Sequence, residues 1–245
     1  MHSSLKAIGR IEGGAEALLD TLIEYFTVED GLFCVPTHTW AFMKNEITLD
    51  MTAIETCLGA FSKIALCHPD GIRSENPTHS MVVFGSKERA ASFVEGELDV
   101  VSGTAPNSCY GKIYEQGGHI LLVGVSHNRN TYLHCVDEII GVTNRLTHEP
   151  LGVNIRRVSG EIVERKIHAH STDYTKDISL RFPQYETAFR YHGCITDGYI
   201  GNAPVQLCDA RGMKDVMELI FKNGDGADPL TDETAIPQAL YCIKN

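Results

Sequence analysis

The sequence predicts an α/β fold that carries a β-hairpin insertion. Short apolar runs of strand length alternate with segments whose apolar residues recur at helical spacing, which is the pattern of an α/β protein. The clearest strand is HILLVGV at 119–125, and a polar, alternating stretch at 152–171 predicts the hairpin. A chain of 245 residues without internal repeats or a low-complexity linker is of ordinary size for one such domain.

The first quarter of the chain contains two predicted helices and one strand. Residues 15–26 form the first helix, since their apolar side chains share one helical face. That face consists of Ala15, Leu18, Leu19, Leu22, Ile23 and Phe26. Residues 32–35 form a short buried strand, and residues 45–65 form a second helix with apolar residues on one face.

Strands and helices continue to alternate through the middle of the chain. We expect a strand over residues 80–84, a short helix over residues 87–94 and a helical turn over residues 112–115. The central strand at 119–125 leads through a polar loop into a helix that begins at Thr131.

The last part of the chain holds the hairpin and one more helix. A Ser-Gly turn at 159–160 joins the two strands of the hairpin. A helix is predicted over residues 211–222, and a loop rich in Gly and Asp follows at 223–228.

Charge and cysteine content narrow the functional classes. The net charge is −11 and no basic stripe is present, so we expect no nucleic-acid partner. The acidic balance favours cationic substrates, although it is also a common solubility feature. No apolar run reaches membrane-span length and no secretory signal follows Met1, so we expect no membrane partner. Eight cysteines without a CxxC pair indicate reduced thiols in a cytoplasmic protein and argue against a zinc knuckle.

The strand-loop-helix segment at 119–140 carries the strongest chemical signal. Loops at the carboxyl ends of central strands hold ligands in α/β folds, and His134 lies in the first turn of the helix after such a loop. Asp137 and Glu138 follow at i+3 and i+4, so both carboxylates share a helical face with the imidazole. A histidine oriented by a carboxylate can act as a general base. The same spacing also occurs in ordinary surface histidines.

Weaker candidates lie elsewhere in the chain. His79, in the loop Pro77-Thr78-His79-Ser80, could contact a substrate or assist proton transfer. Hydroxyls and a lysine in the segment at 2–6, close to a helix start, suit phosphate groups. Cys109 lies in a loop and is a more plausible nucleophile than Cys135. His168 and His170 alternate on a predicted strand, but without a third ligand nearby we expect no metal site.

Five ordered segments resemble the antibiotic (aminoglycoside) 3-N-acetyltransferase family, which is distinct from the GNAT acetyltransferases. They are HSSLKAIGRIEGG at 2–14, VPTHTW at 35–40, NPTHSMVVFG at 76–85, NSCYGKIYEQGGHILLVGVSHNRNTYLH at 107–134 and GYIGNAPVQLCDARGMKDVMELI at 198–220. The resemblance implies a single domain over residues 1–245, with a central mixed sheet and flanking helices. It also implies acetyl-CoA as co-substrate and a polycationic, polyamine antibiotic as acceptor.

Residue by residue, the resemblance assigns roles to the candidates. His134 is similar to the catalytic histidine of the family pattern Thr-x-x-His-x-x-acid, in which Thr131 and Asp137 hold the flanking positions. The family usually has Glu where this chain has Asp137, so either Asp137 or Glu138 could pair with His134. The implied coenzyme contacts are Ser3, Ser4, Lys6, Ser108 and Tyr110, with Cys109 in place of a family proline. The implied substrate contacts are His79 and Ser80.

The resemblance also bears on the N-terminus and on the reaction. Family members carry a strand that ends at the His-Ser-Ser motif, and since Met1 directly precedes that motif we expect the strand to be lacking. The expected reaction is direct acetyl transfer to the 3-amino group of an aminoglycoside, with His134 as the base and Thr131 near the oxyanion. The alternatives are another amine acceptor, a non-catalytic coenzyme binder, or a cysteine amidase that uses Cys109. The oligomeric state is left open.

Overall fold

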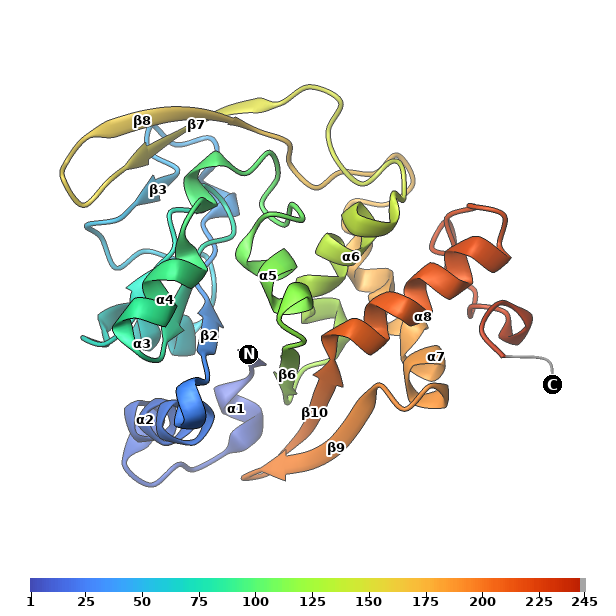
Figure 1. Cartoon of the computed structure of the whole chain (residues 1–245), viewed down its shortest axis with the longest axis horizontal. Helices are drawn as coiled ribbons and strands as arrows, with labels where there is room; N and C mark the ends of the chain where they lie inside the picture. Colours follow the sequence, from blue (N-terminus) through green and yellow to red (C-terminus); the bar gives the residue numbers. More distant parts are fainter. Residues whose placement is uncertain (243–245) are drawn as a thin grey trace.

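Three small sheets, flanked by helices, form the framework of the protein (Figure 1). The computed structural model describes residues 1–242. The central sheet has the order β1-β6-β10-β9. Its strands are β1 (His2–Ser3), β6 (His119–Val123), β10 (Ala203–Asp209) and β9 (Ile195–Ile200). Because β1 is parallel to β6 whereas β10 is antiparallel to both β6 and β9, the sheet is mixed, which confirms the predicted fold class.

The other two sheets have three strands each. One has the order β2-β5-β4, with antiparallel strands β2 (Phe33–Pro36), β5 (Met81–Phe84) and β4 (Ile72–Arg73). The other has the order β3-β7-β8, with β3 (Leu49–Asp50), β7 (Leu151–Arg156) and β8 (Ile162–Ile167). Strands β7 and β8 are the predicted hairpin, which extends along one side of the molecule, far from the β9–β10 hairpin (Figure 1).

Eight α-helices are present in the described part of the chain. They are α1 (Leu5–Ile8), α2 (Gly14–Phe26), α3 (Ala60–Cys67), α4 (Lys87–Val94), α5 (Cys109–Glu115), α6 (Tyr132–Ile140), α7 (Glu186–Tyr191) and α8 (Ala210–Asn223). Short 3₁₀ segments occur at Val28–Asp30, Trp40–Phe42, Glu97–Asp99, His127–Arg129, Ile178–Tyr185 and Gln238–Leu240. The predicted helices at 15–26, 87–94 and 211–222 are confirmed, since apolar periodicity sets all three.

The predicted helix over residues 45–65 is wrong over its first two thirds. Helix α3 begins only at Ala60, and residues 49–50 form strand β3 instead. Backbone amides on both sides of β3 donate to β7, from Thr48 to Asn154 at 2.9 Å and from Met51 to Arg156 at 2.8 Å. Pairing with a distant hairpin therefore overrides the local helical pattern.

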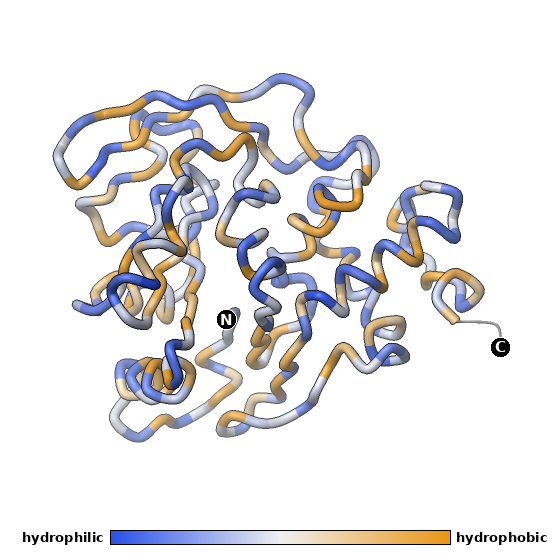
Figure 2. Tube along the Cα trace, viewed as in Figure 1, coloured by the Kyte–Doolittle hydropathy of each residue, from blue (hydrophilic) through white to orange (hydrophobic). Residues whose placement is uncertain are grey.

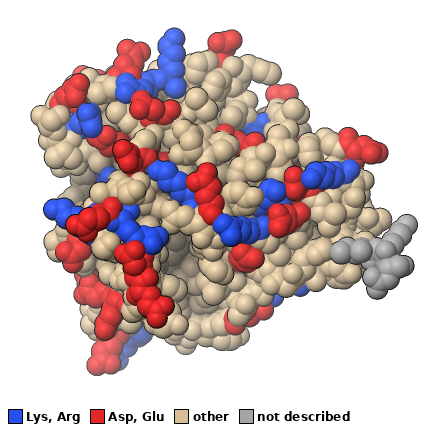
Figure 3. Space-filling model, in the orientation of Figure 1, with Lys and Arg blue, Asp and Glu red and all other residues tan. Residues whose placement is uncertain are grey.

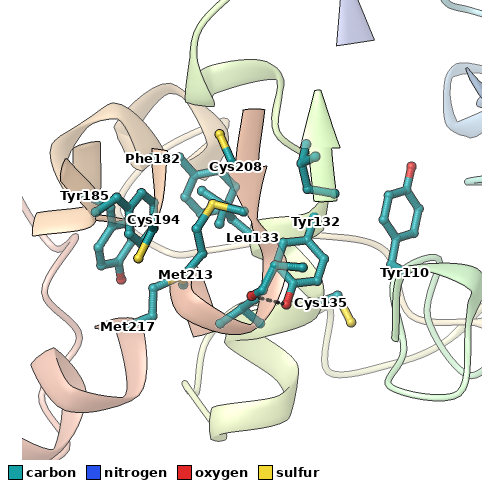
Figure 4. Packing of buried hydrophobic residues seen from close by; sticks show 14 of the residues in the cluster. Tyr110, Tyr132, Leu133, Cys135, Phe182, Tyr185, Cys194, Cys208, Met213 and Met217 are labelled. Carbon is teal, nitrogen blue, oxygen red and sulfur yellow. Dashed lines mark hydrogen bonds between the residues drawn. The ribbon is translucent and has the colours of Figure 1, made fainter. Parts of the chain in front are cut away.

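The largest core lies between the central sheet, α6 and α8 (Figure 4). Strand β6 is the most continuously hydrophobic segment at the centre of the trace, whereas the β7–β8 hairpin alternates between polar and apolar residues (Figure 2). The buried hydroxyl of Tyr132 on α6 donates to the carbonyl oxygen of Ala210 at 2.8 Å, which ties α6 to the start of α8. Within residues 1–242, no helix combines the length and apolar character needed to cross a bilayer.

Replacing Gly111 with alanine is expected to destabilise the protein by roughly 1–3 kcal/mol, the usual cost of overpacking. A Cβ atom at this position would lie 1.7 Å from the backbone carbonyl oxygen of Pro106, so the whole start of α5 must shift. Urea unfolding would measure the loss. Gly198→Ala is the matched control, because no atom lies within 4 Å of its Cβ position. Equal stability of the two variants would contradict this packing.

Candidate active site

A cavity of about 360 Å³ lies where several distant segments of the chain meet. Its lining includes the imidazoles of His38, His79, His134 and His170, which we call the four-histidine cluster. Each ring contacts the next, with centroid separations of 4.6 Å for His38–His79, 4.9 Å for His79–His170 and 3.9 Å for His134–His170. A neighbouring cavity of about 340 Å³ is more apolar and contains none of the four rings.

Two copies of one tripeptide bring His38 and His79 together. Pro36-Thr37-His38 follows β2, and Pro77-Thr78-His79 precedes the antiparallel strand β5. The backbone pairing continues past the strands, because the amide of Thr37 donates to Ser80 at 2.7 Å and that of Thr39 donates to Thr78 at 2.8 Å. The sequence prediction missed His38, although the repeated Pro-Thr-His would have been a usable signal.

The loop that carries His79 is held rigidly. The side-chain oxygen of Asn76 accepts from the amides of Thr78 at 3.2 Å and His79 at 2.8 Å, and its amide nitrogen donates to Gly103 at 3.0 Å. A Cβ atom at Gly103 would lie 2.0 Å from Nδ1 of His79, so only glycine fits there. His79 thus lines the cavity, and its role as a substrate contact stays a prediction.

Ser80, the other predicted substrate contact, does not reach the cavity. Its side chain is fully buried and its hydroxyl donates to the carbonyl oxygen of Thr37 at 2.9 Å. This hydrogen bond fixes the β2–β5 pairing, so Ser80 supports the loops and does not line the site.

Packing alone holds the ring of His134. Helix α6 places it in the first turn, where it is 9% exposed and lines the cavity. It forms no hydrogen bond with any described residue, and its buried Nδ1 has no partner. Its face is stacked on His170 with an angle of 9° between the rings, and Phe182 contacts its edge at a centroid distance of 4.8 Å.

His134 is neutral at neutral pH. Burial lowers its pKa well below the ordinary value of about 6.5, and the nearby His170, Arg145 and His38 lower it further. The neutral ring keeps a lone pair for accepting a proton.

Asp137 does not hydrogen-bond to His134, although its position on α6 predicted that pairing. It is fully buried, and its Oδ2 accepts from Nε of Arg145 at 2.6 Å. Arg145 in turn donates to both carboxylate oxygens of Asp228, at 2.6 and 2.8 Å. Tyr174 completes this buried ion network by hydrogen bonds to Arg145 and Asp228. The interaction with Arg145 competes with the expected one, and Oδ1 of Asp137 has no partner.

Glu138 is also not hydrogen-bonded to His134. Its carboxylate accepts from the hydroxyls of Ser102 at 2.6 and 2.8 Å and of Thr104 at 2.7 Å. The Thr104 hydroxyl lies 2.8 Å from Nε2 of His170, so Glu138 is linked to this second imidazole. Nothing local in the sequence pairs His170 with α6, so the sequence suggested no role for it beyond metal ligation, which was not expected.

Thr131 is the only predicted catalytic residue besides His134 that lines the cavity. It is the N-cap of α6, yet its hydroxyl makes no capping hydrogen bond. The side chain is therefore not committed to the helix.

None of the five predicted coenzyme residues lines this cavity, whereas Tyr110 lines the neighbouring, more apolar one. Ser4 and Ser108 cap α1 and α5, where their hydroxyls accept from the amides of Ala7 at 3.3 Å and of Tyr110 at 3.2 Å. Ser3 pairs with β6, and Lys6 is exposed on α1. The hydroxyl of Tyr110 lies 2.7 Å from Nε2 of His38, so Tyr110 orients a ring of the cluster.

The buried position of Cys109 contradicts the cysteine amidase hypothesis. Its thiol is fully buried, and burial followed by the charge of Glu97 raises its pKa well above the ordinary value. A thiol that resists ionisation is a poor nucleophile. Burial raises the pKa of Cys135 in the same way. Among the described residues, no group of three His, Cys, Asp or Glu side chains has the arrangement of a metal site.

Comparisons with known proteins agree on one family. The family described as aminoglycoside 3-N-acetyltransferase matches residues 1–222. The SPbeta prophage-derived aminoglycoside N(3')-acetyltransferase-like protein YokD of Bacillus subtilis (strain 168) is 22% identical over 92% of this chain and 86% of its own. The crystal structure of YokD has a TM-score of 0.76, with 21% identity over 93% of this chain and 87% of its own.

Two further solved structures contain ligands. Aminoglycoside acetyltransferase AAC(3)-IVa, a histidine-to-alanine mutant in complex with a gentamicin, has a TM-score of 0.74, with 22% identity over 90% of this chain and 80% of its own. AAC-IIIb in a binary complex with CoASH has a TM-score of 0.71, with 19% identity over 87% of this chain and 85% of its own. At these identities the structures show a shared fold.

Proposed function

The chain belongs to the aminoglycoside 3-N-acetyltransferase family, and from this premise we propose that it transfers the acetyl group of acetyl-CoA to an amino group of an aminoglycoside, the 3-amino group by the family description. The observation that carries the proposal is the buried, neutral His134 at the wall of a cavity of about 360 Å³. Eight unpaired cysteines are consistent with a reducing, cytoplasmic setting.

The proposed step is direct transfer in a ternary complex. The amine nitrogen attacks the thioester carbonyl carbon, and His134 accepts the proton that the nitrogen releases as the new N–C bond forms. The C–S bond then breaks, and the coenzyme leaves as a thiol after taking up the proton that the His134 imidazolium returns. The hydroxyl of Thr131, which does not cap α6, is our candidate donor to the tetrahedral oxyanion.

The charges on the cavity wall fit an anionic coenzyme. Arg129 and Lys176 line the cavity and can meet phosphate groups. Together with the CoASH complex of AAC-IIIb, they support acetyl-CoA as the donor. Lys6 on the nearby helix α1 remains a proposed third cation.

The small number of carboxylates in the cavity wall suggests a second candidate acceptor. Asp177 is the only carboxylate among the described residues that line the cavity, whereas an aminoglycoside carries several ammonium groups. On the face shown in Figure 3, acidic side chains lie among basic ones and form no separate acidic field. An acceptor amine with fewer positive charges therefore fits the immediate cavity as well as an aminoglycoside does.

A thiol-release assay with acetyl-CoA, a panel of aminoglycosides and a panel of monoamines tests the proposal. We expect amine-dependent release and an acetylated product by mass spectrometry. Release with aminoglycosides supports the main proposal, and release with monoamines alone supports the second acceptor. Acetyl-CoA binding by calorimetry without release on any amine would identify a non-catalytic coenzyme binder.

A further inference from the structure

We propose that His170 is the positioning residue for His134: Glu138 anchors it through Thr104, and its ring face orients the catalytic imidazole and keeps that imidazole unprotonated. This inference rests on the proposed function. It assigns Glu138, which the sequence suggested as a partner of His134, to a different imidazole.

The hydrogen bonds from Glu138 through Thr104 to His170 form a chain that we call the relay. Counting the protons along it shows which nitrogen of His170 carries a proton. The carboxylate of Glu138 accepts one proton from Thr104 at 2.7 Å and another from Ser102 at 2.6 Å. The only proton of the Thr104 hydroxyl is thus used, so Nε2 of His170, 2.8 Å away, must donate to the Thr104 oxygen. The network therefore assigns the Nε2–H tautomer to His170.

In many enzymes a hydrogen bond to a carboxylate orients the catalytic histidine. Here the ring of His170 takes over that function for His134. Nδ1 of His134 has no partner, and Asp137 is paired with Arg145. What restrains the ring is a stack on His170, with centroids 3.9 Å apart, and an edge contact from Phe182. Because the relay fixes His170, the face of His134 is fixed as well.

The stacking of His170 on His134 also affects the protonation of the two rings. Two parallel imidazoles 3.9 Å apart cannot both be charged at low cost. Arg145, His38 and His170 face His134 and disfavour its protonation. Burial lowers the pKa of His170 to about 4, so this ring is neutral at neutral pH as well, and the charge of Asp177 only partly opposes that shift.

The remaining titratable groups around the two rings do not restore a proton to His134. His79 contacts the ring of His170, and burial lowers its pKa well below the ordinary value, so it is neutral too. Asp137 is the acid nearest to His134 along α6, and its charge is balanced by Arg145 at 2.6 Å. His134 therefore keeps its lone pair at neutral pH.

Four variants test this inference by kinetics. His170→Ala removes the stacking ring and should lower kcat by about 10- to 10²-fold, as expected for a misplaced catalytic group, with the KM for acetyl-CoA little changed. His170→Phe restores a flat ring and should recover most of kcat, but the acidic limb of kcat/KM should move to higher pH because one cause of the lowered His134 pKa is gone. Thr104→Val should lower kcat, whereas Thr104→Ser, which keeps the hydroxyl, should not.

NMR of ¹⁵N-labelled imidazoles tests the inference without turnover. In the wild type we expect the Nε2–H tautomer for His170. We also expect His134 to stay neutral until the pH falls well below about 6.5, the ordinary titration midpoint of histidine. In His170→Phe the midpoint of His134 should rise. A His134 that titrates normally in the wild type, or that is unchanged in a folded His170→Phe, overturns the inference. Missing acetyl transfer by the wild type counts against the proposed function alone.

Discussion

Replacing His134 with glutamine is expected to lower kcat by at least about 10²-fold, the usual minimum contribution of general base catalysis. Glutamine keeps a polar side chain of similar reach, but it cannot take up the proton that the attacking amine must lose. The dissociation constant of acetyl-CoA should change little, since the step that is lost follows binding. Steady-state kinetics with calorimetry on the same preparations would measure both quantities.

His148→Gln is the matched control for this variant. His148 is exposed and lines none of the described cavities, so its replacement should leave kcat unchanged. A folded His134→Gln enzyme with kcat near that of the control would remove His134 from the role of base.

Replacing Arg145 with methionine is expected to lower the free energy of unfolding by about 3–5 kcal/mol, because removal of one partner leaves buried charge uncompensated. Arg145 is 3% exposed and pairs with the fully buried Asp137 and with Asp228. The side-chain volume is roughly kept, so the loss reports the charges and hydrogen bonds. Guanidinium unfolding monitored by circular dichroism at neutral pH would measure it.

The loss in Arg145→Met should shrink on acidification. Although burial opposes ionisation, the hydrogen bonds from Arg145 and Tyr174 lower the pKa of Asp228 below its ordinary value. A lowered folded-state pKa contributes stability that is present at neutral pH and is lost as the pH falls through that pKa. The wild type therefore loses this contribution in acid, and the variant has none of it to lose.

Arg190→Met is the control for Arg145→Met. Arg190 also pairs with two carboxylates, those of Glu186 and Asp197, but these pairs are solvent-exposed. Exposed pairs contribute about 0–1 kcal/mol. Similar losses in the two variants would mean that the Arg145 network is no more important than a surface ion pair.

Sequence patterns predicted the elements whose stabilising interactions lie close together in the chain. Helix α4 has the predicted bounds, 87–94, and the β7–β8 hairpin forms around the predicted Ser-Gly turn. The β9–β10 hairpin was not predicted, because ITDGYI at 195–200 contains a glycine and an aspartate that weaken the strand signal. The hairpin joins the central sheet through the pairing of β10 with β6, a contact between segments that lie far apart in the sequence.

In the candidate active site, too, local sequence predicted some residues, whereas others depend on contacts between distant segments. The two histidines that local patterns singled out, His134 and His79, both line the cavity, and their proposed roles there stay predictions. His170 was not assigned to the site, because it lies 36 positions from His134 in the chain and meets that ring only in the folded protein. Helical spacing suggested an acid for His134, but it could not reveal that Arg145 and Thr104 compete for those acids.

A single-turnover measurement tests the central claim most directly. Enzyme in excess over acetyl-CoA is mixed with a saturating acceptor amine, and the acetylated amine is quantified at each time after rapid quenching. Because product release plays no part, the rate reports the chemical step. We predict that His134→Gln slows this step by at least about 10²-fold relative to the wild type and to His148→Gln. Equal single-turnover rates in all three proteins would contradict the account.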